Sequence, residues 1–214
     1  MIVLADNDVL VALAQCDLVN EALTVLNCGF ADCYVLGEAP YSLYLNNPTK
    51  CFDKRLGNPH AFERLCHIVE SCNKLGPAKE NIELLEQLME LDGVHDGELQ
   101  LTLHAENLHA QNSQFTLTTG DKTFLSAIYQ SDCALAKAIL YQRVECLESL
   151  LVKAIGIYGH EYITTKVGYG KETTTNAKKF DTVLSMAFGN GRGEQHTLDC
   201  LQNYMRPTQY FLRP

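Results

Sequence analysis

The sequence predicts an α/β fold in which a central parallel sheet of four or five strands is sandwiched between helices. Two observations lead to this expectation. Short apolar runs alternate along the chain with segments whose apolar residues recur at helical spacing, and this alternation is typical of βαβ units with both faces of the sheet covered. The length of 214 residues also suits one such domain with an extension.

Each expected element has its own signal in the chain. Short, isolated apolar or β-branched runs predict strands at residues 2–5, 33–36, 115–118 and 143–147. An apolar period close to 3.6 predicts helices at residues 9–26, 60–74, 78–91, 97–110, 122–140 and about 147–155. The stretch 46–59 contains Asn-Asn-Pro and Gly-Asn-Pro, so we expect a loop there.

The character of the sequence changes after Gly159. Residues 164–179, TTKVGYGKETTTNAKK, are polar and weakly patterned, which favours a mobile loop or a connection, whereas residues 180–204 again look helical. A segment of about 55 residues rarely builds an independent core. We therefore expect one domain over residues 1–156 and a mostly helical C-terminal extension over residues 157–214.

Composition limits the class of protein. Lys and Arg number 17 and Asp and Glu 26, and the net charge of −9 excludes a protein that holds nucleic acid through a broadly basic surface. No apolar run reaches the roughly 18–20 residues of a membrane helix. The first basic residue is Lys50, which argues against a signal or transit peptide. Nine cysteines without a CxxC pair indicate reduced thiols in a cytoplasmic protein, rather than disulfides or zinc.

Four carboxylates stand at junctions between expected elements. Asp6 directly follows the first strand, Asp121 follows the strand FTLTTG, and Asp96 and Glu98 open the helix near residue 97. A parallel sheet brings strand ends to one edge, where the active sites of such sheets lie. Crowded carboxylates raise one another's pKa unless a cation neutralises them, and oxygen ligands without His or Cys suit Mg²⁺ or Mn²⁺. We expect these four acids to hold such a metal, which would assist hydrolysis of a phosphodiester.

These acids also have ordinary structural interpretations. Asp8 and Asp96 suit helix N-caps, and Asp121 is placed to cap the helix that follows it. Glu98 complements the dipole of its helix from the first turn. Asp6 has the weakest structural explanation, because a carboxylate directly after an apolar strand has little local use.

Four segments in series resemble the successive motifs of PIN-domain nucleases. In chain order they are IVLADNDVLVALA, HDGELQLTLHAENL, FTLTTGDKTFL and RVECLESLLVKA, all within residues 1 to about 156. The resemblance implies a PIN-like α/β/α sandwich and a metal-dependent nuclease, with single-stranded RNA as substrate and Mg²⁺ or Mn²⁺ as cofactor. A toxin, a defence effector and an RNA-processing enzyme all share this pattern, and an antitoxin-type partner or a homodimer fits it.

The resemblance also implies roles for individual residues. Asp6, Glu98 and Asp121 match the catalytic acids of the family. Thr119 matches the hydroxyl neighbour that usually precedes the last of these acids. Asp8 stands where the family commonly has Asn, which implies a supporting role.

One position departs from the family pattern. The family usually has a Glu inside the helix after the second strand, about where Ser42 or Leu43 stands here. Glu38, at the end of that strand, is the nearest acid. We expect Glu38 to replace the missing catalytic carboxylate.

Two other classes of protein fit parts of the sequence. Asp6-Asn7-Asp8 after an apolar strand resembles the nucleophile motif of haloacid-dehalogenase-type phosphatases, with Asp6 attacking phosphorus and Asp8 as acid and base. That family needs a turn and a β-hairpin flap, whereas a helical pattern starts here at Val9. A non-catalytic interaction module on a PIN-like fold is favoured by the missing helix Glu and the long extension, and opposed by the other acids.

Basic residues gather in two segments despite the acidic balance. Residues 50–79 carry six basic and three acidic side chains and residues 153–179 carry five and two, so each segment has a net charge of +3. Both segments contain loop-like stretches, where binding residues are commonly placed. Ordinary solvated lysines are the alternative to a binding role. We expect the RNA backbone to contact Lys166, Lys171, Lys178 and Lys179.

Overall fold

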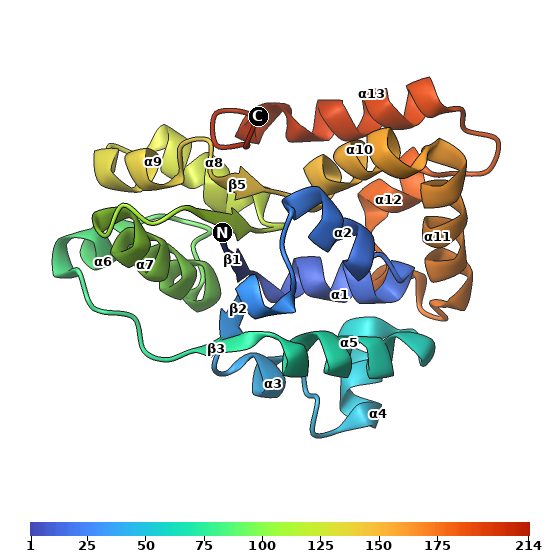
Figure 1. Ribbon diagram of the computed structural model, residues 1–214, viewed down its shortest axis with the longest axis horizontal. Helices are drawn as coiled ribbons and strands as arrows, with labels where there is room; N and C mark the ends of the chain where they lie inside the picture. Colours follow the sequence, from blue (N-terminus) through green and yellow to red (C-terminus); the bar gives the residue numbers. More distant parts are fainter.

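Five parallel strands form the central sheet of the computed structural model, which describes all 214 residues (Figure 1). The order across the sheet is β3-β2-β1-β4-β5. In the centre, Val3 lies opposite Cys33 of β2, and Ile2 lies opposite Phe115 of β4. The expected α/β fold with a parallel sheet is confirmed. The strands are β1 (Ile2–Ala5), β2 (Cys33–Leu36), β3 (Asn73–Leu75), β4 (Phe115–Thr118) and β5 (Val144–Glu145).

Both faces of the sheet are buried under helices, which is compatible with a three-layer sandwich. Successive strand residues point to opposite faces, and accordingly Val3 and Ala5 belong to one core of 35 buried residues whereas Leu4 belongs to another of 19. The first core is covered by α1 (Asn7–Cys16), α2 (Val19–Leu26), α5 (His60–Ser71), α10 (Leu147–Tyr158), α11 (His160–Thr173), α12 (Thr182–Ala187) and α13 (Glu194–Met205). The second is covered by α6 (Ile82–Met89), α7 (Asp96–Ala110), α8 (Lys122–Gln130) and α9 (Ala134–Leu140).

The structure corrects several expected boundaries. The helix expected at 60–74 ends at Ser71, and the next residues form the edge strand β3. This polar strand, Asn73-Lys74-Leu75, pairs on one side only, so no apolar run announces it. The helix expected at 9–26 is interrupted at Asp17, whose left-handed φ of 54° ends α1. Residues 46–59 are not a plain loop, because they contain α4 (Pro48–Cys51) and a π-helical turn, Phe52–Leu56.

The segment 164–179, expected as a loop, is helical up to Thr173. Its threonines do not disrupt the helix, since Thr165 and Thr173 donate hydrogen bonds to carbonyls four residues earlier. Gly170 allows α11 to cross α1 closely, because a Cβ at this position would lie 2.9 Å from the carbonyl oxygen of Gln15. Packing against α1 therefore stabilises a helix that local sequence does not indicate.

The C-terminal extension is mostly helical, as expected, and it contributes to the first core. Ile163 of α11 and Leu201 of α13 are fully buried there. The last residues reach the β5 edge of the sheet, where Val144 N–H donates to Phe211 O and Arg213 N–H donates to Val144 O, both at 2.9 Å. Short helix α3 (Ala39–Ser42) follows β2. None of the helices combines the length and apolar character that crossing a membrane requires.

Candidate active site

The C-terminal ends of β1 and β4 bring Asp6 and Asp121 to the same edge of the sheet. Asp6 follows β1, and its N–H donates to Thr118 O at 3.1 Å. The buried Thr119 hydroxyl donates to Asp6 Oδ2 at 3.4 Å and accepts from the N–H of Asp121 at 3.1 Å. One threonine thus forms hydrogen bonds with both of these residues.

Glu98 approaches the same edge from the first turn of α7. Burial first, and then the charges of Asp8 and Glu98, raise the pKa of the Asp6 carboxyl from 3.8 to about 7. The N–H groups of Asn7 and Gly120 lower that pKa and only partly offset the rise. Burial likewise raises the pKa of Glu98, and the charge of Asp121 adds to the rise. Acids from three elements therefore lie within electrostatic reach of one another, in surroundings that disfavour their charged forms.

Two of these acids also have structural roles. Asp121 caps α8, since its Oδ1 accepts the N–H of Phe124 at 2.9 Å. Asp8 is exposed in the first turn of α1 and lies 3.7 Å from Arg55, so it is not the N-cap that sequence suggested. Asp6 occupies the N-cap position of α1 but makes no side-chain capping bond. Capping therefore does not explain Asp6.

Glu38 and Asp96 lie outside this cluster. Glu38 is exposed before α3, and its charge acts on His104 of α7. Asp96 is the exposed first residue of α7, and neither a hydrogen bond nor an ion pair connects its side chain to Asp6, Glu98 or Asp121. The structure thus gives no support to Glu38 as a replacement carboxylate.

Ser42 contacts the residue that follows Asp6. Its hydroxyl accepts from the side-chain amide of Asn7 at 3.0 Å and donates to Ala39 O at 3.2 Å. A neutral hydrogen-bonded pair, Asn7 with Ser42, therefore lies next to Asp6 in the chain.

A pocket of about 340 Å³ adjoins the site and is lined by Asp8 and Asp121. It is also lined by three residues that the sequence analysis did not predict, Lys122, Glu148 and Asp181. Glu148, buried in the first turn of α10, lies 2.6 Å from Lys122 Nζ through Oε1, while its Oε2 has no hydrogen-bond partner. Asp181, the N-cap of α12, reaches the pocket from the extension. Glu148 lies three residues after the end of β5 and in the first turn of α10, a position comparable to that of Glu98 in α7, whereas nothing local marked Asp181.

The chemistry of the donors fits a hard divalent cation, because all of them are oxygen atoms. No group of three or more His, Cys, Asp or Glu side chains lies close enough together to hold a metal ion. Mg²⁺ does not require such a group, since proteins usually bind it through one or two carboxylates while it keeps several waters. Asp6 and Asp121, linked through Thr119, are the residues that fit this partial shell.

The four lysines expected to bind RNA are in different environments. Lys166 is engaged within the protein, with its Nζ 2.7 Å from Asp17 Oδ2. Lys179 donates to the carbonyl oxygen of Lys54 at 2.8 Å, and it precedes Asp181 of the pocket by two residues. The other two lysines are exposed and form no ion pair; they are Lys171 and Lys178.

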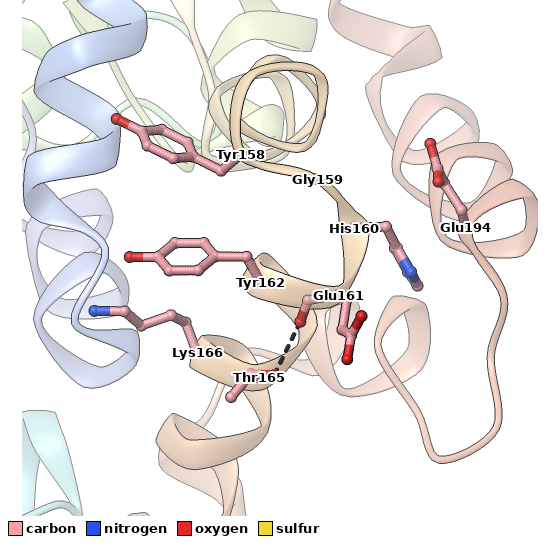
Figure 2. A pocket seen from close by; sticks show the side chains of 8 residues that line it. All are labelled: Tyr158, Gly159, His160, Glu161, Tyr162, Thr165, Lys166 and Glu194. Carbon is pink, nitrogen blue, oxygen red and sulfur yellow. Dashed lines mark hydrogen bonds between the residues drawn. The ribbon is translucent and has the colours of Figure 1, made fainter.

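A wider pocket of about 720 Å³ lies where α10 meets α11 (Figure 2). Tyr158 and Tyr162 stack there, with ring centroids 5.6 Å apart. Two of its polar side chains are engaged within the protein, because Tyr162 donates to Glu21 and the ring of His160 lies 2.9 Å from the Thr197 hydroxyl. We assign no reaction to this pocket.

No family model, no curated protein and no solved structure matches the chain. What the protein does is therefore inferred from its own residues.

Proposed function

We propose that this protein is a metal-dependent nuclease with a PIN-like fold, which hydrolyses phosphodiester bonds in single-stranded RNA. The observation that carries the proposal is that the charge of Glu98 raises the pKa of Asp6 and the charge of Asp121 raises the pKa of Glu98, while Thr119 links Asp6 and Asp121 at the C-terminal edge of the sheet. Carboxylates that are half-buried and close together repel one another, and a bound divalent cation would offset that repulsion. The order of these acids along the chain supports the same class of enzyme.

Some residues of the site orient the carboxylates that would bind the metal, and Asp6 can also carry a proton. A bound Mg²⁺ or Mn²⁺ would supply a Lewis acid that orients water and stabilises negative charge on the phosphate. Thr119 orients the Asp6 carboxyl, and the capping bond to Phe124 orients Asp121. With a pKa of about 7, Asp6 is partly protonated at neutral pH, and it releases that proton when a cation binds.

The phosphatase alternative fits the structure less well. Helix α1 begins at Asn7, directly after Asp6, so no hairpin flap follows the strand. Asp8 is paired with Arg55 at 3.7 Å rather than free to act as acid and base. The interaction-module alternative is favoured by one observation, the neutral Asn7–Ser42 pair at the position of a family acid.

Cleavage of a labelled single-stranded RNA tests the proposal. We expect cleavage with millimolar Mn²⁺, loss of cleavage with EDTA, and loss on Asp6→Asn or Glu98→Gln. Asp96→Asn is the matched control, because Asp96 lies in the same helical turn as Glu98 but outside the cluster. Intact RNA after incubation with folded wild-type protein would favour the interaction module. Release of phosphate from a small phosphate ester, without RNA cleavage, would favour the phosphatase.

A further inference from the structure

Exposed tyrosines lie at both ends of α8, whose first residue lines the candidate active site. At the start of α8, Lys122 Nζ lies 5.4 Å from the ring centroid of Tyr204 on α13. Near its end, Tyr129 contacts Tyr210 with centroids 5.5 Å apart, and Tyr210 contacts Tyr141 at 5.0 Å. The four rings are between 39% and 52% exposed, so they offer aromatic surface to solvent. We call Tyr204, Tyr210, Tyr129 and Tyr141 the tyrosine row.

Holding the C-terminal residues in place accounts for only part of these rings, since Tyr210 and Tyr129 pack edge-on against Phe211 with centroids 4.9 and 6.4 Å away. Phe211 is fully buried in the second core and anchors the end of the chain. Backbone hydrogen bonds on either side of Val144 fix the same segment to β5. The neighbouring Tyr210 is 39% exposed, so its ring contributes surface beyond what this anchor needs.

The sequence segments that carry the row are basic in an acidic protein, although Lys122 is paired with the buried Glu148. Residues 122–143 and 200–214 carry five basic side chains and one acidic side chain, Asp132, for a local charge of 5 − 1 = +4. The rest of the chain then carries −9 − 4 = −13. Lys137 Nζ lies 5.9 Å from the ring centroid of Tyr129, so positive charge is placed directly beside an exposed ring. This combination of charge and aromatic surface complements a polyanion that carries flat bases.

The row is also continuous with the acidic site. Lys122 lines the pocket that contains Asp8 and Asp121. Seven residues separate Lys122 from Tyr129 on one helix, which is about 10 Å at the rise of an α-helix. A strand lying along α8 would therefore reach from the stacked tyrosines to the carboxylates.

We propose that the tyrosine row binds single-stranded RNA by stacking its rings on unpaired bases, with Lys137 facing the backbone phosphates. The proposal rests on the proposed nuclease function, for which it names the path of the substrate. Stacking on aromatic side chains tolerates any base. The row therefore gives affinity and direction without strong sequence preference.

The test measures binding without metal, so that it is independent of cleavage. The full chain carrying Asp6→Asn is titrated in EDTA with a fluorescein-labelled oligouridylate of about 12 nucleotides, within the range of known single-strand sites. We expect Tyr129→Leu and Tyr210→Leu each to weaken binding about tenfold, and the corresponding Phe variants to bind like the parent, because Phe keeps the ring. Tyr169→Leu is the control, since Tyr169 is 43% exposed on α11, over the other face of the sheet. Circular dichroism checks that every variant folds.

Intrinsic fluorescence gives a second readout of the same interaction. The chain has ten tyrosines and no tryptophan, so tyrosine emission is unobscured. RNA should quench this emission in the parent protein, and less so after Tyr129→Leu. Unchanged binding by both folded Leu variants, or equal weakening by Tyr169→Leu, would overturn the proposal. Absence of RNA binding by the parent would also overturn it and would make a protein the better occupant of this surface. If only the nuclease proposal is wrong, the protein should still bind RNA tightly, and the binding should still depend on the tyrosines. Wild-type protein with Mn²⁺ would then leave the same RNA intact.

Discussion

Replacing Asp6 with Asn should stabilise the metal-free protein at alkaline pH, although it removes a proposed catalytic group. Burial and neighbouring charges raise the pKa of this carboxyl from 3.8 to about 7. The folded state therefore holds a proton more tightly than the unfolded state does, so stability falls as pH rises from about 4 to about 7. Below pH 4 both states are protonated and the cost disappears. Above pH 7 the folded protein carries the full cost of a buried charge.

The size of the effect follows from the size of the shift. About three pKa units at roughly 1.4 kcal/mol each set a ceiling near 4 kcal/mol at pH 8. Asp6 is only half-buried, so water and counter-ions reduce this figure, and we expect Asp6→Asn to raise the free energy of unfolding by about 1–3 kcal/mol. Asn resembles the neutral acid in shape, so the gain should shrink towards zero near pH 4.

Urea unfolding at pH 4 and pH 8, in EDTA, measures the difference. Urea is preferable to guanidinium chloride because the salt would screen the charges of interest. Asp96→Asn, at an exposed position of α7, should change the free energy of unfolding little at either pH. A lower stability of Asp6→Asn at pH 8, or a gain of equal size at both pH values, would refute the reasoning.

Three further outcomes are expected. Millimolar Mn²⁺ should raise the melting temperature by binding the native state. Asp121→Asn should weaken that rise, although Asn still caps α8. Scanning fluorimetry with an EDTA control measures both melting temperatures, and no rise in the wild-type protein would favour the interaction module. Changing Lys171 and Lys178 to Gln should lower RNA affinity and flatten its log–log salt dependence by roughly 0.7 for each phosphate that the protein no longer neutralises. If titrations at several salt concentrations show no change, these two lysines are ordinary surface residues. Lys122→Met should destabilise the protein by about 3–5 kcal/mol in urea unfolding, because it leaves the charge of Glu148 buried and unpaired. The double variant with Glu148→Met should recover most of this stability, and no recovery would show that the ion pair is not the cause.

The elements that the sequence predicts best are those with a local cause. Strands β2 and β4 occupy the expected residues 33–36 and 115–118, and β1 occupies residues 2–5, because a run of about four apolar or β-branched residues is too short for a helix and is typical of a buried strand. Strand β3 has no such signal, since a polar edge strand is defined by its partner β2 and not by its own pattern. Helix α11 differs from the expected loop for the same kind of reason, because α1 supports it through the close approach at Gly170.

In the candidate site, too, some features follow from local sequence and others only from tertiary packing. The sequence by itself determined that Asp6, Glu98 and Asp121 stand at junctions of strands and helices, because chain order and the geometry of parallel sheets set those positions. Only the tertiary structure decided that Glu38 faces His104 instead of these acids, since the direction of an exposed side chain after a strand has no local signature. It alone also brought Asp181 into the pocket beside Asp121, 60 residues away along the chain. Contacts of that kind arise from the packing of whole elements into a shared core, and the burial and repulsion that raise the pKa of Asp6 exist only after that packing is complete.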